Sequence, residues 1–417
     1  IGKGKKVPDS LLKVFSENPE YSAKLDSLIN AKNKDPLKIF DKKNAEKLFG
    51  ENLNISASQL EKFNLCRFSY FCNYGLNVRE RLKAEINPMQ YGTLVHYILE
   101  RFFSEYTKEE YLSLEEDKFI EIVRTYLSEY AVTYFGTEQL ESNSFTYRLK
   151  TILDNVIYLM KHIMLELSQS EFFVADCELK IGEDIPSCTI VLPDGHKIAV
   201  CGSVDRVDIM QRNGVSYLRV IDYKTGTKQF KLSDILYGIN LQMLLYLHSI
   251  ENSDSDKYGK ITPAGILYMP ATVPYISADS LKSIDKLPDE LNKNLKMNGL
   301  LLKDTEIIHG MDKTDAATYI PVKIKAGEPV SATSLATLEE FGKIFKKVDM
   351  LIAEMGKNIY DGNIEAKPLK GGHDSCEYCP YDSVCAYRQS SPINCFSVDN
   401  KAVIEEITNE INGKEEE

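Results

Sequence analysis

The sequence predicts a mixed α/β protein in which helices cover the faces of a small sheet. Residues 56–170 are mostly helical in pattern and rich in aromatic residues, whereas the following segment holds short strand-like runs such as FVADCELKI and VSYLRVIDYK. A further helical stretch and the run AGILYM come next. This order of helix, strands, helix and strand is typical of an α/β core. At 417 residues and 43% hydrophobic, the chain can bury one large core or two smaller ones.

Three long helices are predicted. The first follows Asn87-Pro88, with proline near its first turn and an apolar stripe at Val95, Ile98, Leu99 and Phe102. The second begins at Ser233-Asp234, which offers good capping chemistry, and contains the segment QMLLYL. The third runs from about residue 334 to residue 359.

Further strands are expected at SCTIVL, KIAVCGSVDRVDIM and YIPVKI, with a polar insertion at 272–318. The first fifty residues are lysine-rich and helical in pattern, without a strand signal, and the chain starts at Ile1. These features predict a fragment of a longer polypeptide. The expected divisions are a helical segment at 1–55, a helical region at 56–170, a core at 171–330, a long helix with a cysteine cluster at 331–395, and an acidic tail at 396–417.

A hairpin at residues 202–226 brings two acids together. Asn213-Gly214 predicts a two-residue type I′ turn, because both central residues must take positive φ. Arg212 then pairs with Val215, and the same register places Asp205 opposite Asp222. Alternation along the strand puts Lys224 on the same face as Asp222.

Like charges that face each other across strands are destabilising, and a cation would remove that penalty. Two carboxylates with a lysine beside them form a candidate site for Mg²⁺ or Mn²⁺, which favour oxygen ligands. The alternative is a solvated acidic sheet face on which Lys224 is only a salt-bridge partner. A bulge between Asp205 and the turn would break the register.

Polar side chains on two helices could join this site. Gln242 and Tyr246 are four residues apart and share a helix face, while His96 lies at the margin of an apolar stripe. Taken singly, each has an ordinary explanation: Gln242 as a surface residue, Tyr246 as half core, and His96 as a packed histidine.

Cysteine spacing gives a second signal. Cys376, Cys379 and Cys385 stand together in HDSCEYCPYDSVC, and a closed zinc or iron-sulfur site needs a fourth ligand. Cys66 is the best candidate, although spacing alone does not exclude Cys72 or Cys395. The alternative is three incidental thiols.

Charge and hydropathy restrict the class of protein. The net charge of −12 argues against a free-standing protein that coats nucleic acid with a broad basic surface. The local basic runs RERLK (79–83) and KTGTKQFK (224–231) could still contact phosphates near the acid pair. No apolar run reaches the ~18 residues of a membrane span and no secretory signal is visible, so a cytoplasmic location is the expectation.

The combination resembles a known family. GSVDRVD, IDYKTG, QMLLYL, a histidine on the leading helix and an early cysteine joined by C-x2-C-x5-C are similar to the nuclease domain of the B subunit of AddAB-type helicase-nucleases, within the PD-(D/E)xK or RecB-like nucleases. The resemblance covers about residues 56–385. It implies a restriction-endonuclease-like mixed sheet flanked by helices, with a 4Fe-4S cluster stapling the N- and C-terminal parts.

The resemblance also implies roles for individual residues. His96, Asp205, Asp222 and the Tyr223 carbonyl would bind magnesium, Lys224 would orient or activate water, and Gln242 and Tyr246 would hold DNA or a metal-bound water. Cys66, Cys376, Cys379 and Cys385 would hold the cluster. Glu178 stands where the family often has an acid.

The implied function is a metal-dependent DNA exonuclease domain that processes double-strand breaks for recombinational repair. It would cut single strands delivered by the helicase-nuclease's other chain, the A subunit, as heterodimer partner. The early cysteine departs from the family in reading Cys66-Arg67-Phe68, and no G-x4-G-K-[ST] phosphate loop occurs. The alternatives are a non-catalytic DNA-binding or assembly module with a structural cluster, and a stand-alone RecB-like or Cas4-like exonuclease.

Overall fold

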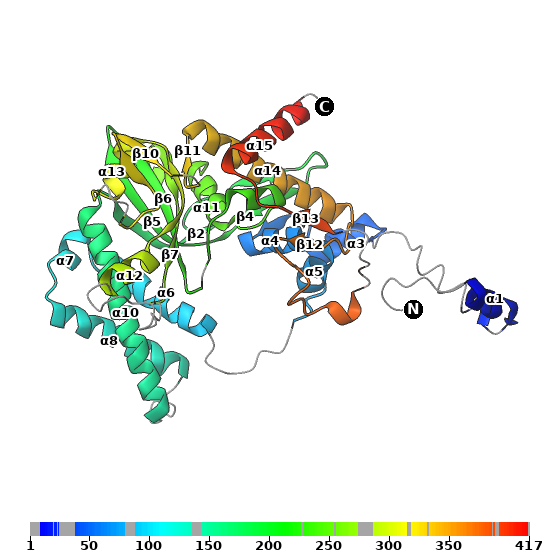
Figure 1. Ribbon diagram of the computed structural model, residues 1–417, viewed down its shortest axis with the longest axis horizontal. Helices are drawn as coiled ribbons and strands as arrows, with labels where there is room; N and C mark the ends of the chain where they lie inside the picture. Colours follow the sequence, from blue (N-terminus) through cyan, green and yellow to red (C-terminus); the bar gives the residue numbers. More distant parts are fainter. Residues whose placement is uncertain are drawn as a thin grey trace.

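The fold is described from a computed structural model of the chain (Figure 1). The structure describes residues 9–415, except 20, 23, 25–37, 80–87, 136–142, 227, 254–255, 274–286, 315–317, 332, 386 and 388–391. Most of the lysine-rich segment before residue 38 and most of the basic run at 79–83 therefore lie outside the described residues.

A six-stranded mixed sheet forms the centre, with the order β11-β8-β7-β6-β5-β2. β6 pairs with β7 in parallel, and β8 pairs with β11 in parallel, while the other neighbours are antiparallel. The strands are β2 (Phe173–Ile181), β5 (Gly202–Arg212), β6 (Val215–Lys224), β7 (Ile261–Pro270), β8 (Asn298–Leu302) and β11 (Leu335–Ala336).

Helices cover both faces of this sheet, as the sequence predicts (Figure 1). On one side lie α6 (Pro88–Glu105), α7 (Lys108–Leu112), α8 (Glu116–Phe135) and α10 (Asn143–Gln169). On the other lie α11 (Gln242–Glu251), α14 (Leu338–Tyr360) and α15 (Asn400–Glu415). The remaining α-helices are α1 (Asp9–Glu17), α3 (Lys42–Phe49), α4 (Ala57–Leu65), α5 (Arg67–Tyr70), α12 (Leu287–Leu295) and α13 (Thr305–Met311).

Smaller pairings and turns complete the described part of the chain. β1 (Leu53–Ile55), β4 (Lys197–Val200) and β3 (Thr189–Val191) form a three-stranded sheet, β9 (Lys323–Lys325) pairs with β10 (Glu328–Val330), and β12 (Leu369–Gly371) pairs with β13 (Ile393–Cys395). A π-helical turn, η1, spans Phe71–Gly75, and 3₁₀ turns span Leu232–Tyr237 (η2), Asp256–Tyr258 (η3) and Asp382–Val384 (η6).

The main core lies between the sheet and its helices. The predicted stripe of α6 is buried, with Val95, Ile98 and Phe102 at 0% exposure. The third predicted helix is confirmed as α14, which begins after a capping box at Thr337 and Glu340. Both findings follow from helical periodicity and capping chemistry.

Several expectations about elements are wrong. The helix expected from Ser233 begins only at Gln242, because Gly238 and Asn240 take positive φ and end the 3₁₀ turn η2 first. Asn64 fills the space beside Gly238, where a Cβ would lie 2.3 Å from its amide nitrogen. The strand expected at 319–324 is only Lys323–Lys325, and the segment 1–55, expected to be helical, ends with a short strand, β1.

The C-terminal end also differs from the expectation of an acidic tail. Asn400–Glu415 forms α15, and its Val403 and Ile407 are fully buried against the main core. The apolar residues of this segment are spaced three and four apart, which is the pattern of an amphipathic helix.

Candidate active site

The hairpin of β5 and β6 forms as predicted. Asn213 and Gly214 have φ of 54° and 76°, and Arg212 pairs with Val215. The register runs without a shift to the pair Arg206 and Ile221, so Asp205 and Asp222 come next, at the end of the ladder. The acid pair therefore lies where the turn chemistry places it.

Both acids lie on the same side of the sheet. On one face of the sheet, Arg206 contacts Asp208 and Glu166 of α10. Because side chains alternate along a strand, Asp205 and its cross-strand neighbour Asp222 face the other way, towards α11. The charges of both acids act on Tyr246 of α11, together with burial, and raise its pKa to about 12. Asp222 is 3% exposed, and the Asp205 side chain is 11% exposed.

A third acid, Glu178 of β2, lies beside this pair. The pairs Cys177–Arg206 and Leu179–Val204 flank it, which places Glu178 next to Asp205 across the strands. Glu178 has φ of 49°, a left-handed conformation that is strained for a residue with a Cβ and that clusters at functional sites. The carboxylate accepts a hydrogen bond from Ser203 Oγ at 2.6 Å.

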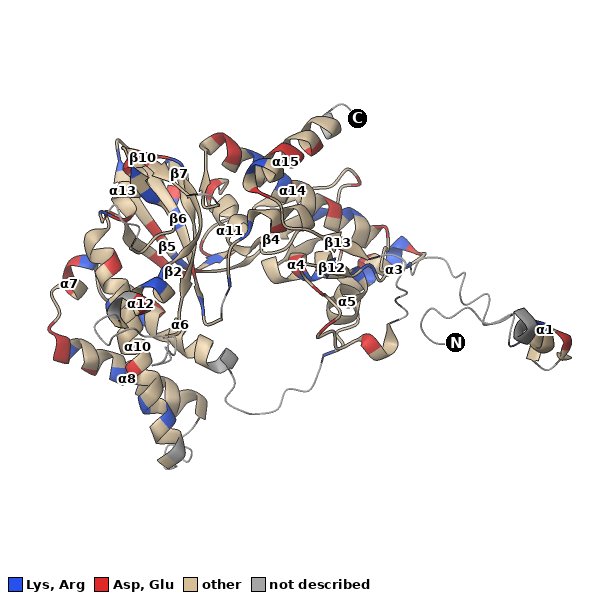
Figure 2. Ribbon diagram, viewed as in Figure 1, with Lys and Arg blue, Asp and Glu red and all other residues tan. Residues whose placement is uncertain are grey.

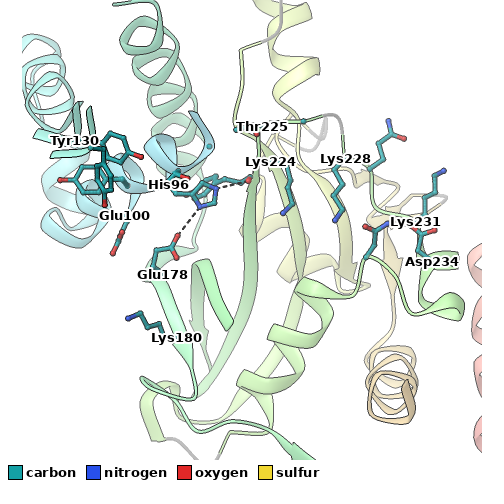
Figure 3. A pocket seen from close by; sticks show the side chains of 18 of the residues that line it. His96, Glu100, Tyr130, Glu178, Lys180, Lys224, Thr225, Lys228, Lys231 and Asp234 are labelled. Atoms are coloured by element: carbon teal, nitrogen blue, oxygen red, sulfur yellow. Dashed lines mark hydrogen bonds and ion pairs between the residues drawn. The ribbon is translucent and has the colours of Figure 1, made fainter. Parts of the chain in front are cut away.

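His96 of α6 closes the group (Figure 3). Its Nδ1 lies 3.4 Å from Glu178 Oε1 and 3.6 Å from Asp205 Oδ2, and its Nε2 lies 3.3 Å from the Tyr223 carbonyl oxygen. One ligand atom from each of His96, Glu178 and Asp205 lies within 4.8 Å of the others. Such an arrangement of imidazole and carboxylates can hold a divalent metal ion.

The acids disturb one another electrostatically. Burial and the Asp222 charge raise the pKa of Asp205 to about 7, although Tyr223 N donates a hydrogen bond to Asp205 Oδ2 at 2.8 Å. Burial also raises the pKa of Asp222, against the opposing effect of Lys224. Burial lowers the pKa of His96, but the hydrogen bond to Glu178 and the nearby carboxylates outweigh it and raise the pKa to about 9. The metal-free site thus holds protons that a cation would displace.

Lys224 and the α11 residues lie around the acid pair. Lys224 Nζ is 2.5 Å from Asp222 Oδ2 and donates to Gln242 Oε1 at 3.4 Å. Tyr246 packs against the start of β5, where a Cβ on Gly202 would lie 2.5 Å from the tyrosine hydroxyl. Glycine at this position therefore allows Tyr246 to approach the strand that carries Asp205.

A buried charge network supports the site from the opposite face of the sheet. Arg206, Asp208, Arg219 and Glu166 are all 0% exposed. Arg206 Nη2 donates to Asp208 Oδ2 at 2.8 Å, and Arg219 Nη2 donates to Glu166 Oε1 at 2.7 Å. Arg206 Nη1 also donates to the Tyr223 hydroxyl at 3.2 Å, so the network holds the residue whose carbonyl accepts from His96.

A pocket of about 1210 Å³ opens over the site (Figure 3). His96, Glu178 and Lys224 line its middle, with tyrosines of α6 and α8 on one side and Lys228 and Lys231 on the other. Elsewhere, basic and acidic residues are interspersed over the described elements (Figure 2). Positive charge is thus brought to this site by individual lysines.

The cysteines come together from distant parts of the chain. Cys66 caps α5, and the charges of Cys385 and Cys379 contribute to its raised pKa, which is chiefly due to burial. Backbone N–H groups of Ser69 and Phe68 oppose that rise by stabilising the thiolate. Cys385 is similarly affected by Cys379 and Cys376.

Cys72 and Cys395, the two alternatives to Cys66 as fourth ligand, differ in position. Cys72 also feels the charges of Cys385 and Cys379, so it lies beside the group. Cys395 instead packs with Ile239 and Leu369, and its electrostatic neighbours are Asp234 and Lys231. Contacts between the same chain segments bring Tyr381 Oη to the Val78 carbonyl at 2.8 Å.

Sequence reasoning missed part of this site. The left-handed backbone of Glu178 and the contact between α6 and β2 have no local sequence signal, so the closeness of Glu178 to His96 could not be predicted from spacing. Arg206, Asp208 and Arg219 are charged residues within strand sequences, and this signal could have predicted the buried network.

Comparisons with known proteins agree with this geometry. Residues 54–386 match the PD-(D/E)XK nuclease superfamily. The chain belongs to this superfamily, as the sequence motifs indicate.

Curated relatives of this chain share one name. The chain is 32% identical to the B subunit of the ATP-dependent helicase/deoxyribonuclease of Clostridium acetobutylicum, over 89% of this chain and 33% of the relative. It is 33% identical to the proteins of the same name from Clostridium kluyveri and Ruminiclostridium cellulolyticum, over 97% and 92% of this chain and 36% and 34% of the relatives. The chain thus spans about a third of the length of these relatives.

No helix among the described residues is both long enough and apolar enough to cross a lipid bilayer.

Proposed function

We propose that this chain is the nuclease module of a helicase-nuclease and that it hydrolyses phosphodiester bonds of single-stranded DNA. The observation that carries the proposal is the grouping of Asp205, Asp222 and Lys224 on one side of the sheet, next to His96 and Glu178. Superfamily membership supports the same reaction class. By the names of the relatives, the partners would be DNA and a second helicase-nuclease subunit. The role we propose for the assembly is the processing of double-strand breaks.

The residues at the site fit a hard divalent cation, Mg²⁺ or Mn²⁺. Burial and the Asp222 charge raise the proton affinity of Asp205, and the ligand atoms of His96, Glu178 and Asp205 lie within 4.8 Å of one another. Asp222 and the Tyr223 carbonyl would complete the set of ligands. When bound, the metal would polarise the phosphoryl group and lower the pKa of water.

The chain's own groups would do the remaining work. Lys224 places an ammonium group beside Asp222, where it would stabilise charge that develops on the phosphate. Gln242 accepts a hydrogen bond from Lys224 and would hold the ammonium in place. Tyr246 would contribute a hydroxyl donor on the same side of the sheet, because its raised pKa keeps it protonated.

The cysteines fit a larger metal centre. The charges of Cys379 and Cys385 act on Cys66, that of Cys379 also acts on Cys385, and N–H groups stabilise the Cys66 thiolate. Because Zn–S bonds are about 2.3 Å long, two sulfurs on one zinc ion lie at most about 4.6 Å apart. The described part of the chain has two groups of three candidate ligand atoms that lie within 4.8 Å of one another, and neither group contains these thiols. This spread favours a 4Fe-4S cluster held by Cys66, Cys376, Cys379 and Cys385 over a single ion.

A metal-dependent assay on end-labelled single-stranded DNA tests the proposed activity. We expect magnesium-dependent cleavage by the parent chain, loss of detectable cleavage in Asp222→Ala, and at least about a hundredfold slower cleavage in Lys224→Gln. Asp176→Asn is the matched control, because Asp176 also lies on a strand of the six-stranded sheet, the edge strand β2, but binds Lys257 and Tyr258 instead.

The competing function is a non-catalytic DNA-binding or assembly module. The raised pKa of Asp205 disfavours it, because two carboxylates buried beside each other resist ionisation and destabilise a fold that has no use for them. Equal cleavage by the parent and Asp222→Ala chains would refute the assigned site. A parent chain that binds DNA but never cleaves it would support the competitor.

A further inference from the structure

Three tyrosines form one wall of the pocket over the active site. Tyr97 belongs to α6, and Tyr130 and Tyr134 belong to α8, and all three line the pocket. The ring centroids of Tyr97 and Tyr130 are 5.2 Å apart, and those of Tyr130 and Tyr134 are 4.3 Å apart in a stacked arrangement. Tyr134, the outermost ring, is 63% exposed, whereas Tyr130 is 4% exposed.

Neighbouring charged residues hold these three tyrosines in place. Arg101 donates a hydrogen bond to the Tyr97 hydroxyl at 3.1 Å and forms an ion pair with Glu129, which joins α6 to α8. Ordering the rings in advance reduces the entropy lost on binding. An exposed aromatic ring supported in this way is suited to stacking against a planar ligand.

The opposite side of the pocket carries positive charge. Lys224, Lys228 and Lys231 line it, and Figure 3 shows Lys228 and Lys231 on the far side of the active-site residues from Tyr130. Glu100 lies next to the tyrosines instead. A phosphate is therefore favoured at the lysine side and disfavoured at the tyrosine side.

The size of the pocket points to an extended ligand. Its volume of about 1210 Å³ exceeds the ~300–1,000 Å³ typical of a site for one small molecule. Single-stranded nucleic acid combines planar bases with a charged backbone, and proteins bind it with aromatic stacking platforms and basic grooves. Paired bases in a duplex are already stacked on each other and do not offer a free face.

We infer that the exposed ring of Tyr134, stacked on Tyr130 and backed by Tyr97, stacks against a base of single-stranded DNA while the lysines across the pocket hold its phosphates. The inference rests on the proposed function, because it places the stacked base beside the bond that His96, Asp205 and Lys224 would act on. It assigns selection of single strands to Tyr134. Since every base has a π-face, this contact is tolerant of sequence.

The chain has no tryptophan, which allows a direct test. A Tyr134→Trp variant carries a single tryptophan, whose fluorescence we expect to fall when an oligothymidine binds in buffer without magnesium. An oligonucleotide that is abasic at every position has the same phosphates and should leave the signal nearly unchanged. Tyr147→Trp is the control, because Tyr147 is 72% exposed on α10 and does not line the pocket.

Binding affinity gives a second readout. We expect Tyr134→Ala to bind the oligothymidine about tenfold more weakly than the parent, with an unchanged melting temperature and unchanged affinity for the abasic strand. If the parent cleaves single strands but Tyr134→Ala binds them equally well, the inference is overturned and the proposed function stands. If Tyr134→Ala weakens binding but the parent never cleaves, the proposed function fails and the inference stands. Equal quenching by normal and abasic strands also overturns the inference.

Discussion

Asp205 and Asp222 place two carboxyl groups in a nearly dry part of the sheet. Burial, together with the nearby Asp222 charge, explains why the pKa of Asp205 rises to about 7 when no cation is present. A folded-state pKa above the unfolded value of about 4 means that the folded state holds the proton more tightly. Ionisation of Asp205 therefore destabilises the metal-free fold as pH rises from about 4 to about 7.

Asp205→Asn should remove this destabilisation. Without added metal at pH 8, we expect the variant to melt at least about 2 °C above the parent, because it no longer opposes the Asp222 charge. At pH 5 the difference should shrink, since the parent carboxyl is then protonated. Thermal melts at both pH values, repeated with Asp176→Asn as the control, test the expectation.

Magnesium should reverse the order of stability. The parent gains stability from the bound ion, whereas Asp205→Asn has lost a proposed ligand and should gain less. A parent chain that melts above Asp205→Asn at pH 8 without metal would show that the carboxylates do not repel each other as described.

The sequence predicts these single-residue features unevenly. Asn213-Gly214 sets the hairpin register, so the position of Asp205 relative to Asp222 follows from local chemistry. The position of His96 beside Glu178 depends on how α6 packs on β2, which no local pattern encodes. Tyr134 was not predicted for the same reason, since its role depends on where α8 lies relative to the hairpin.

The elements around the site are joined by the buried network of Arg206, Asp208, Arg219 and Glu166. It connects β5 and β6 to α10, with Asp208 accepting from Arg206 at 2.8 Å and from Arg219 at 2.9 Å. Buried ion pairs add little net stability over apolar residues, but removing one member leaves the others uncompensated. Through this network, the stability of the β5–β6 hairpin depends on its contact with α10.

Asp208→Ala should be strongly destabilising. We expect the free energy of unfolding to fall by about 3–5 kcal/mol, because two buried guanidinium groups lose their shared partner. Chemical denaturation gives this value directly. Asp176→Ala, which breaks a more exposed pair with Lys257, should cost only about 1 kcal/mol or less. Similar losses for the two variants would contradict the role of the network.

The structure of α11 shows where local signals mislead at the level of elements. Ser233-Asp234 has good capping chemistry, yet only a 3₁₀ turn follows it, and the helix starts at Gln242. Gly238 has a positive φ, and Asn64 leaves no room for a Cβ there, so the turn ends at this glycine. The change matters for the site, because Gln242 becomes the first residue of α11 and reaches Lys224.

At the level of the whole molecule, the two ends of the superfamily match lie side by side (Figure 1). Leu65 of α4 packs against the small apolar cluster that includes Leu369 of β12. Tyr381, between the C-terminal cysteines, contacts Val78, and Arg67 of α5 pairs with Glu354 of α14. A link between such distant residues closes a long loop, and the entropy of the unfolded chain falls accordingly. The proposed cluster would thus stabilise the fold without contacting the pocket.

Cys385→Ser tests this tie. We expect the parent, purified without oxygen, to be brown with absorbance near ~400 nm, the signature of cysteine-ligated iron. Cys385→Ser should lose that absorbance, melt several degrees lower, and be cleaved faster by proteases between residues 361 and 399, because the thiolates no longer hold this segment against α5.

Cys72→Ser is the matched control, since Cys72 lies beside the same thiols without being a proposed ligand, and it should keep the colour. Asp222→Ala should keep it as well, because Asp222 is not a proposed ligand of the cluster. A colourless parent with one equivalent of zinc, or loss of colour in Cys72→Ser rather than Cys385→Ser, would overturn the assignment of the cluster.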